Sequence, residues 1–187
     1  MKGKHNMKKV LLFFANGTEE IEALTAVDLL RRAGAQVTVA GVGGTELTGS
    51  HGIRVTADIE ENEIPSFDYD MVVVPGGMPG TNHMDASEIV DKALSAVHNR
   101  GGFLAAICAA PLVLGKRGYL SGKKAICYPG FEPYLTGAIL SEMRVCRDGC
   151  VITAAGAGAA TDFALALIDA LFGADKASEI RRSILAD

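Results

Sequence analysis

Short runs of consecutive apolar residues alternate along this chain with longer segments whose apolar residues recur at helical spacing. A short continuous apolar run is typical of a strand buried on both faces of a sheet, whereas apolar residues three and four apart predict an amphipathic helix. Strands are predicted at residues 10–14, 36–40, 71–74, 103–107 and 124–127. Helices are predicted at residues 19–33, 86–99, 109–116, 161–172 and 174–185.

Two further segments have the pattern of hairpins. Residues 45–57 alternate in polarity and contain glycines, which indicates a small hairpin or an edge strand. Residues 144–147 and 150–154 flank Asp148-Gly149, a turn-forming pair. Because buried strands alternate with helices, we expect an α/β fold with a mainly parallel sheet covered on both faces. We assign residues 8–187 to a single domain and residues 1–7 to an N-terminal extension.

Composition and charge exclude several classes of function. The 187 residues are 49% hydrophobic, enough for the core of one ordinary domain, and the net charge is −4. This charge gives no reason to expect nucleic acid or an anionic membrane as a partner. No apolar run approaches the roughly 18 residues of a membrane span, and no signal-peptide pattern precedes the first strand. We therefore expect a cytoplasmic protein.

The four cysteines are expected to be unpaired thiols, because a chain of this size in a reducing compartment needs no disulfide. Cys127, Cys146 and Cys150 have the pattern of packing residues in strands or beside a hairpin. No Cys-x-x-Cys pair occurs, and the four histidines lack ligand spacing, so no metal is expected. Dinucleotide and Walker motifs are also absent, so no cofactor is expected.

Cys108 differs from the other cysteines because it lies where a buried strand passes directly into a helical segment. Its neighbours are small, as a sharp strand-to-helix turn requires, and Pro111 suits a first helical turn. A thiol facing a helix N-terminus is expected to have a pKa below its usual value of about 8.5, which favours the nucleophilic thiolate. The alternative is a buried thiol that packs as a small hydrophobic side chain.

Glu22 is the second unusual position. It shares one helix face with apolar residues such as Ala26, so it is predicted to point inward near the rim that carries Cys108. A carboxyl group placed there can be protonated and can exchange a proton with the thiol. The alternative is a solvated carboxylate in the first turn of the helix, which is what we expect of Glu19 and Glu20.

Other strand exits supply candidate pocket residues. Ligands in open parallel sheets bind beyond the carboxyl ends of the strands, where this sequence carries Asn16, Gly156 and the turn that includes Gly76 and Gly77. The backbone N–H groups of that turn and of Ala109 are candidate donors to an oxyanion. Glycine pairs are common in turns of every kind.

Six segments, at residues 17–22, 27–34, 37–41, 69–77, 105–111 and 161–166, resemble the DJ-1/ThiJ/PfpI superfamily, and its DJ-1 and YajL-like branch most closely. The resemblance implies a flavodoxin-like three-layer sandwich and a homodimer. It matches Cys108 to the reactive cysteine of the family and Glu22 to its protonated partner. It also matches Gly76, Gly77 and Ala109 to the turns of the oxyanion pocket.

The sequence departs from the family pattern at two positions. Tyr128 stands where many members carry a histidine near the cysteine, which argues against a Cys-His hydrolase and against peptidase activity. His51 follows Ser50 where members often carry a basic residue that reaches the partner's pocket, although an exposed hairpin histidine is the alternative.

The resemblance implies a cofactor-independent glyoxalase or protein deglycase that acts on methylglyoxal-type dicarbonyls or glycated adducts and protects against stress. In this hypothesis the Cys108 thiolate adds to an aldehyde and Glu22 transfers protons. The alternative is an oxidative-stress sensor or chaperone in which the same thiol is oxidised to a sulfinate. Both hypotheses use one site, so the sequence does not separate them.

Overall fold

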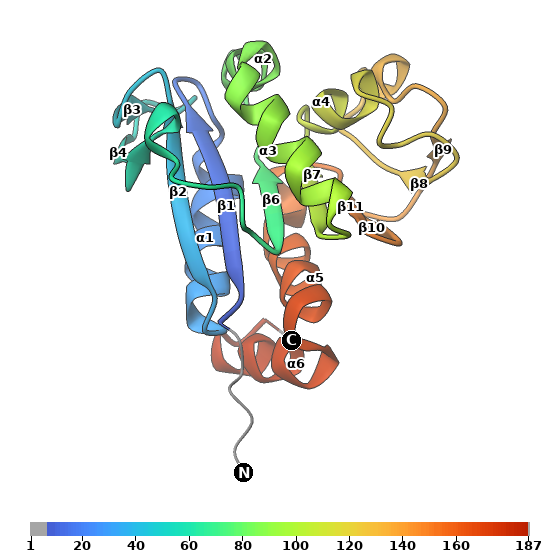
Figure 1. Ribbon diagram of the computed structural model, residues 1–187. Coiled ribbons are helices and arrows are strands. Elements are labelled where there is room, and N and C mark those ends of the chain that lie inside the picture. The colour runs from blue at the N-terminus through green and yellow to red at the C-terminus, as the bar shows by residue number, and fades with distance from the viewer. Residues whose placement is uncertain (1–6, 187) are drawn as a thin grey trace.

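In the computed structural model, which describes residues 7–186, a seven-stranded sheet lies between two layers of helices (Figure 1). All neighbouring strands are parallel except for one antiparallel pair at an edge. From that edge the strands are β10 (Val145–Asp148), β11 (Val151–Ala154), β7 (Phe103–Ile107), β6 (Met71–Val74), β1 (Lys9–Ala15), β2 (Gln36–Val42) and β5 (Ile59–Glu60). The predicted α/β class is therefore confirmed.

Helices cover both faces of the sheet. One face packs against α1 (Glu20–Arg32), α5 (Ala160–Phe172) and α6 (Ala174–Ser183). The other packs against α2 (Gly80–Ala86), α3 (Glu88–Asn99) and α4 (Pro111–Lys116). Successive residues of β1 contribute to opposite cores: Leu12 lies in the first and Leu11 and Phe13 in the second. This double burial explains why the strand is a continuous apolar run.

Two small sheets lie outside the main one. The predicted hairpin at residues 45–57 is present as the antiparallel pair β3 (Glu46–Thr48) and β4 (Arg54–Thr56). The strand predicted at residues 124–127 is shorter, and its assignment to the main sheet is wrong. It forms β8 (Lys124–Ala125), which pairs only with β9 (Ile139–Leu140). Ala125 and Cys127 are apolar because they pack into the core beside α4.

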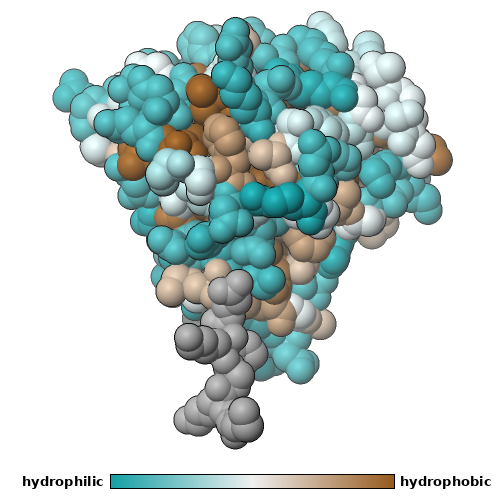
Figure 2. Space-filling view, viewed as in Figure 1, coloured by the Kyte–Doolittle hydropathy of each residue, from teal (hydrophilic) through white to brown (hydrophobic). Residues whose placement is uncertain are grey.

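Hydrophilic side chains dominate the face of the molecule seen in Figure 2, and apolar side chains gather in small areas among them. Within residues 7–186, no helix has both the length and the apolarity needed to cross a bilayer. The extension predicted at residues 1–7 lies outside the described residues except for Met7, which is exposed.

Candidate active site

Four strands that are neighbours in the sheet end at one rim. In the order β11, β7, β6 and β1, their exits carry Gly156, Cys108, Gly76 and Asn16. The predicted meeting of these exits follows from the parallel order of the strands. Cys108 and Gly76 follow adjacent central strands, and α1 begins a few residues beyond Asn16. The rim therefore combines backbone turns from separate parts of the chain.

Cys108 occupies a strained backbone turn. Its φ is +65°, a left-handed conformation that a residue other than glycine seldom adopts. Its backbone is held on both sides, because its N–H donates to Ala154 O at 2.9 Å and its carbonyl accepts the Tyr128 N–H at 2.8 Å. The side chain is half-buried. A strained nucleophile on a sharp strand-to-helix turn is a known arrangement in hydrolases with an exposed serine.

Glu22 is buried, as its helix face predicts. Its side chain is 1% exposed, and its Oε2 accepts the Gly76 N–H at 2.8 Å. Its Oε1 is also buried and accepts no hydrogen bond from the described residues. The carboxyl group faces the Cys108 thiol closely enough for each to affect the pKa of the other. The structure thus brings together the two residues that the sequence singles out.

The absence of a side chain at Gly76 allows Glu22 and Cys108 to approach each other. A Cβ at this position would lie 2.7 Å from both Cys108 Cβ and Glu22 Oε2, and 2.9 Å from Ile107 O. No side chain fits in that space without displacing one of its neighbours. The predicted role of Gly76 as an oxyanion donor is not what the structure shows, because its N–H is used to hold Glu22.

The pKa values of the pair are set mainly by burial. Burial raises the pKa of Glu22 to about 7, although the Gly76 N–H opposes the rise. Burial and the negative charge of Glu22 raise the pKa of Cys108 to about 12. The N–H groups of Ala109 and Gly77 lower it, but by less. The lowered thiol pKa expected from the sequence is therefore wrong. The sequence pattern identifies the adjacent helix but does not show the burial or the facing carboxyl.

These two groups titrate as a pair. The first proton leaves near pH 7 and the second only near pH 12, so the pair holds one proton between these values. A proton on Glu22 removes the charge that disfavours the thiolate of Cys108. The N–H groups of Gly77 and Ala109, which face the sulfur, then stabilise that thiolate, as their predicted positions in the pocket require.

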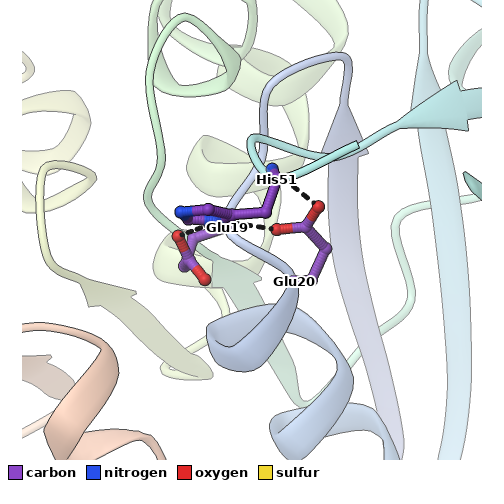
Figure 3. A group of neighbouring side chains, drawn as sticks. All are labelled: Glu19, Glu20 and His51. Carbon is purple, nitrogen blue, oxygen red and sulfur yellow. Dashed lines mark hydrogen bonds and ion pairs between the residues drawn. The ribbon is translucent and has the colours of Figure 1, made fainter. Parts of the chain in front are cut away.

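His51 contacts the beginning of α1 in its own chain. Figure 3 shows its imidazole beside Glu19 and Glu20, with Nδ1 3.2 Å from a carboxylate oxygen of each. The expected solvation of Glu20 is wrong, since this residue is only 3% exposed. Its Oε1 accepts the His51 N–H at 2.9 Å and the Ile53 N–H at 3.3 Å. Although burial opposes it, these bonds lower the pKa of Glu20 and so favour its charged form.

The Glu19, Glu20 and His51 side chains place three possible metal-ligand atoms within 4.8 Å of one another. Sequence spacing did not show this group, because the hairpin brings His51 back to residues about 30 positions earlier in the chain. The Glu20 oxygens are already occupied by hydrogen bonds from the hairpin. These hydrogen bonds therefore attach the β3–β4 hairpin to the first turn of α1.

Asn16 and Tyr128 have different relations to the thiol. Asn16 Oδ1 accepts the Thr48 N–H at 2.8 Å, so this side chain holds the hairpin and does not turn toward Cys108. The Tyr128 ring is 51% exposed and lies over Gly156, where a Cβ would be 3.3 Å from the ring and 3.9 Å from Cys108 Sγ. Tyr128 therefore forms a wall beside the thiol.

Residues 8–170 match the model of the DJ-1/PfpI family. This chain belongs to the DJ-1/PfpI family. Protein dj-1beta of Drosophila melanogaster is 40% identical over 181 residues, which cover 95% of this chain and 97% of that protein. The glutathione-independent glyoxalase DJR-1.2 of Caenorhabditis elegans is 28% identical over 177 residues and 94% of each chain.

The solved structures of DJ-1/PfpI proteins agree with the flavodoxin-like sandwich. Oxidized Toxoplasma gondii DJ-1 superposes with a TM-score of 0.92 at 38% identity, covering 95% of this chain and 98% of that one. Drosophila melanogaster DJ-1beta gives a TM-score of 0.90 at 39% identity, with 96% and 98% covered. The superfamily and the fold implied by the sequence resemblance are therefore confirmed.

All four cysteines of this DJ-1/PfpI protein are free thiols. Cys146 lies opposite Thr153 in the register of β10 and β11, and Cys150 belongs to the turn, so the hairpin does not pair these two cysteines. Gly156, predicted as a strand exit beside the site, lies near Cys108 as expected. The sequence did not identify Arg144, which lines a cavity together with Gly156 but looks like any exposed cation before a strand.

Replacement of Gly76 by alanine tests the close packing around this glycine. Gly76→Ala should lower the free energy of unfolding by about 1–3 kcal/mol, because the methyl group would overlap three neighbouring atoms. Gly158→Ala is the matched control, since the nearest atom to its new Cβ would be Arg144 Nη2 at 3.7 Å. Urea unfolding measures both. Equal stability of the two variants would contradict the packing described here.

The pH dependence of stability tests the raised pKa of Glu22. Folding favours protonated Glu22, so its stabilising contribution is complete below the ordinary pKa of 4.5 and is lost as pH rises through about 7. The loss should be on the order of 3 kcal/mol relative to Glu22→Gln. Urea unfolding of both proteins between about pH 4 and pH 8 measures it. Parallel stability curves would show that the carboxyl is not held in a protonating environment.

Proposed function

We propose that this protein is a cofactor-independent glyoxalase and protein deglycase, which acts on methylglyoxal-type dicarbonyls or their adducts through Cys108. The observation that carries the proposal is the buried Glu22 carboxyl facing a strained thiol, with two backbone N–H groups directed at the sulfur. The similarity to glutathione-independent glyoxalase DJR-1.2 supports the same reaction class. A protective role in a reducing cytoplasm is consistent with four free cysteines.

The proposed reaction begins when the Cys108 thiolate adds to the aldehyde carbon of methylglyoxal and forms a hemithioacetal. The Gly77 and Ala109 N–H groups stabilise the oxyanion that this addition creates. Glu22 donates its proton to this oxyanion and becomes a carboxylate. It then removes the proton from the former aldehyde carbon and returns it to the neighbouring carbonyl carbon, while the hydroxyl proton moves to the neighbouring oxygen, and a lactoyl thioester results. Water hydrolyses the thioester, so that lactate leaves and the thiol is restored.

The pKa of Glu22 suits this proton transfer. A group that both accepts and donates protons is most effective when its pKa is near the working pH, and burial raises the pKa of Glu22 to about 7. Tyr128 occupies the position of the histidine found in many relatives, and its phenol ring lacks the imidazole nitrogen that serves as the base of a Cys-His pair. We therefore do not propose a Cys-His peptidase.

A cysteine-based oxidative-stress sensor or chaperone is the second candidate function. The same geometry favours it, because the Gly77 and Ala109 N–H groups and a protonated Glu22 can donate hydrogen bonds to sulfinate oxygens. The two functions differ in turnover: a sensor changes its oxidation state, whereas the enzyme releases a product and restores its thiol.

A homodimer is also part of the proposal. Ile21 and Leu24 are adjacent on one face of α1 and are 57% and 39% exposed. Ile53 is 52% exposed, and its backbone N–H donates to Glu20, the residue that precedes Ile21 in α1. These three residues form an apolar surface of the kind that buries itself against a second copy.

Turnover of methylglyoxal tests the enzyme. Wild type should form lactate, and Cys108→Ala and Glu22→Gln should each lower kcat/KM by at least about 100-fold, because each removes a group that reacts directly. Cys150→Ala is the control, since this half-buried thiol belongs to the hairpin turn. A lactate assay with purified proteins measures all four.

The same proteins distinguish the sensor. If wild type forms no lactate but peroxide selectively oxidises Cys108 to the sulfinate, the sensor hypothesis replaces the enzyme. If Cys108 is inert toward both methylglyoxal and peroxide, the thiol is a packing residue and both functions fail. Mass spectrometry of the peptide that contains Cys108 reports its oxidation state.

Light scattering after size-exclusion chromatography tests the dimer. Wild type should have twice the mass of one chain, and Ile21→Glu should be a monomer, because a charge at the centre of the apolar surface opposes its burial. Ile139→Glu is the control, since Ile139 has a similar exposure of 55% on the distant strand β9. A monomeric wild type, or a dimeric Ile21→Glu, would refute this surface.

A further inference from the structure

A cavity of about 360 Å³ lies beside Gly156, close to Cys108. Tyr128 and Pro129 form one wall, and residues 155–159, which lead into α5, form another. Gly156 lines this cavity and has no side chain to block the path from it to the thiol, since a Cβ at Gly156 would lie 3.9 Å from Cys108 Sγ. A substrate bound to Cys108 can therefore extend into this cavity.

Arg144 is the one charged residue among those that line the cavity within the described chain. It directly precedes β10, and its carbonyl accepts the Ala155 N–H at 2.9 Å, which ties it to the opposite wall. Its guanidinium donates to Gly158 O, and Gly158 also lines the cavity. The positive charge is therefore held at the cavity wall by the backbone of the segment that carries Gly156.

The charge of Arg144 is only partly neutralised. Its nearest carboxylate, Asp162, lies 3.9 Å away, whereas Arg181 approaches the same carboxylate at 3.1 Å. Two guanidinium groups thus share one negative charge. Glu132, near the opposite wall, uses its carboxylate to accept the Gly130 N–H of its own loop and does not line the cavity. Arg144 therefore contributes positive charge to the cavity wall.

We propose that Arg144 gives this site a preference for α-oxoaldehydes that carry a carboxylate a few bonds from the reacting carbonyls. The inference rests on the proposed function and names its substrate class. Arg144 touches the remote end of the substrate, so it determines specificity and takes no part in the chemical steps at Cys108. Its planar guanidinium can bind a carboxylate through two parallel hydrogen bonds.

Two substrates of similar length test the preference. Carboxyethylglyoxal ends in a carboxylate, whereas butylglyoxal ends in a methyl group, and both present the same reacting carbonyls. Wild type should favour carboxyethylglyoxal in kcat/KM by on the order of fivefold, the effect expected of one solvent-accessible ion pair. Arg144→Gln should abolish this preference through KM, with kcat unchanged, and Arg144→Lys should retain part of it.

Arg147→Gln is the matched control. Arg147 lies on β10, three residues after Arg144, pairs with Asp169 at 3.0 Å and does not line the cavity, so its loss should leave the preference intact. The inference is overturned if wild type handles both substrates alike, if Arg144→Gln lowers kcat/KM equally for both, or if Arg147→Gln has the same effect as Arg144→Gln.

A second measurement does not depend on turnover. Each α-oxoaldehyde should protect Cys108 from alkylation by iodoacetamide, and carboxyethylglyoxal should protect wild type at a lower concentration than butylglyoxal does. Arg144→Gln should remove this difference. Selective protection without product formation would refute the proposed enzyme and retain the anion preference. Product formation without any selectivity would retain the enzyme and refute the preference.

Discussion

The candidate site depends on the contact of a buried carboxyl with a half-buried thiol across a residue that has no side chain. Glu22 lies in the first turn of α1, Cys108 follows β7, and Gly76 follows β6. One hydrogen bond, from Gly76 N–H to Glu22 Oε2, fixes the carboxyl, and the missing Cβ of Gly76 lets it approach the thiol. Because burial disfavours the charged forms of both groups, the pKa values of Glu22 and Cys108 are both raised.

The order of strands in the sheet explains why three separate segments meet there. Strands β6 and β7 are neighbours at the centre of the sheet, and β1, which leads into α1, lies beside β6. All three run parallel, so their carboxyl ends reach the same rim. Backbone hydrogen bonds from Cys108 to Ala154 and from Tyr128 to Cys108 then lock the strained turn. The sheet thus positions the groups, and the turns bring them into contact.

The sequence predicts those parts of the structure that depend on local pattern. The double burial of β1 appears as an apolar run, and the inward direction of Glu22 follows from its helical spacing to Ala26. Features that depend on distant partners were missed. Ala125 and Cys127 look like a strand of the main sheet because burial makes them apolar, yet β8 pairs only with β9 in a separate sheet. Glu20 resembles a solvated helix-start carboxylate until the hairpin closes over it. The high pKa of the thiol likewise arises from burial in the folded chain and from Glu22, which lies far from Cys108 in the sequence.

The hydrogen bonds that attach the β3–β4 hairpin to α1 have a thermodynamic consequence. Glu20, which holds His51 and Ile53, is two residues from Glu22 on the same helix turn. If the hairpin detached, Glu20 would lose the N–H groups that favour its charged form, and the start of α1 would be free to fray. A molecule that binds the hairpin near Ile53 therefore also stabilises the turn that carries Glu22. By linkage, binding at that outer surface and the ordering of the helix turn that carries the Glu22 carboxyl stabilise each other by the same free energy.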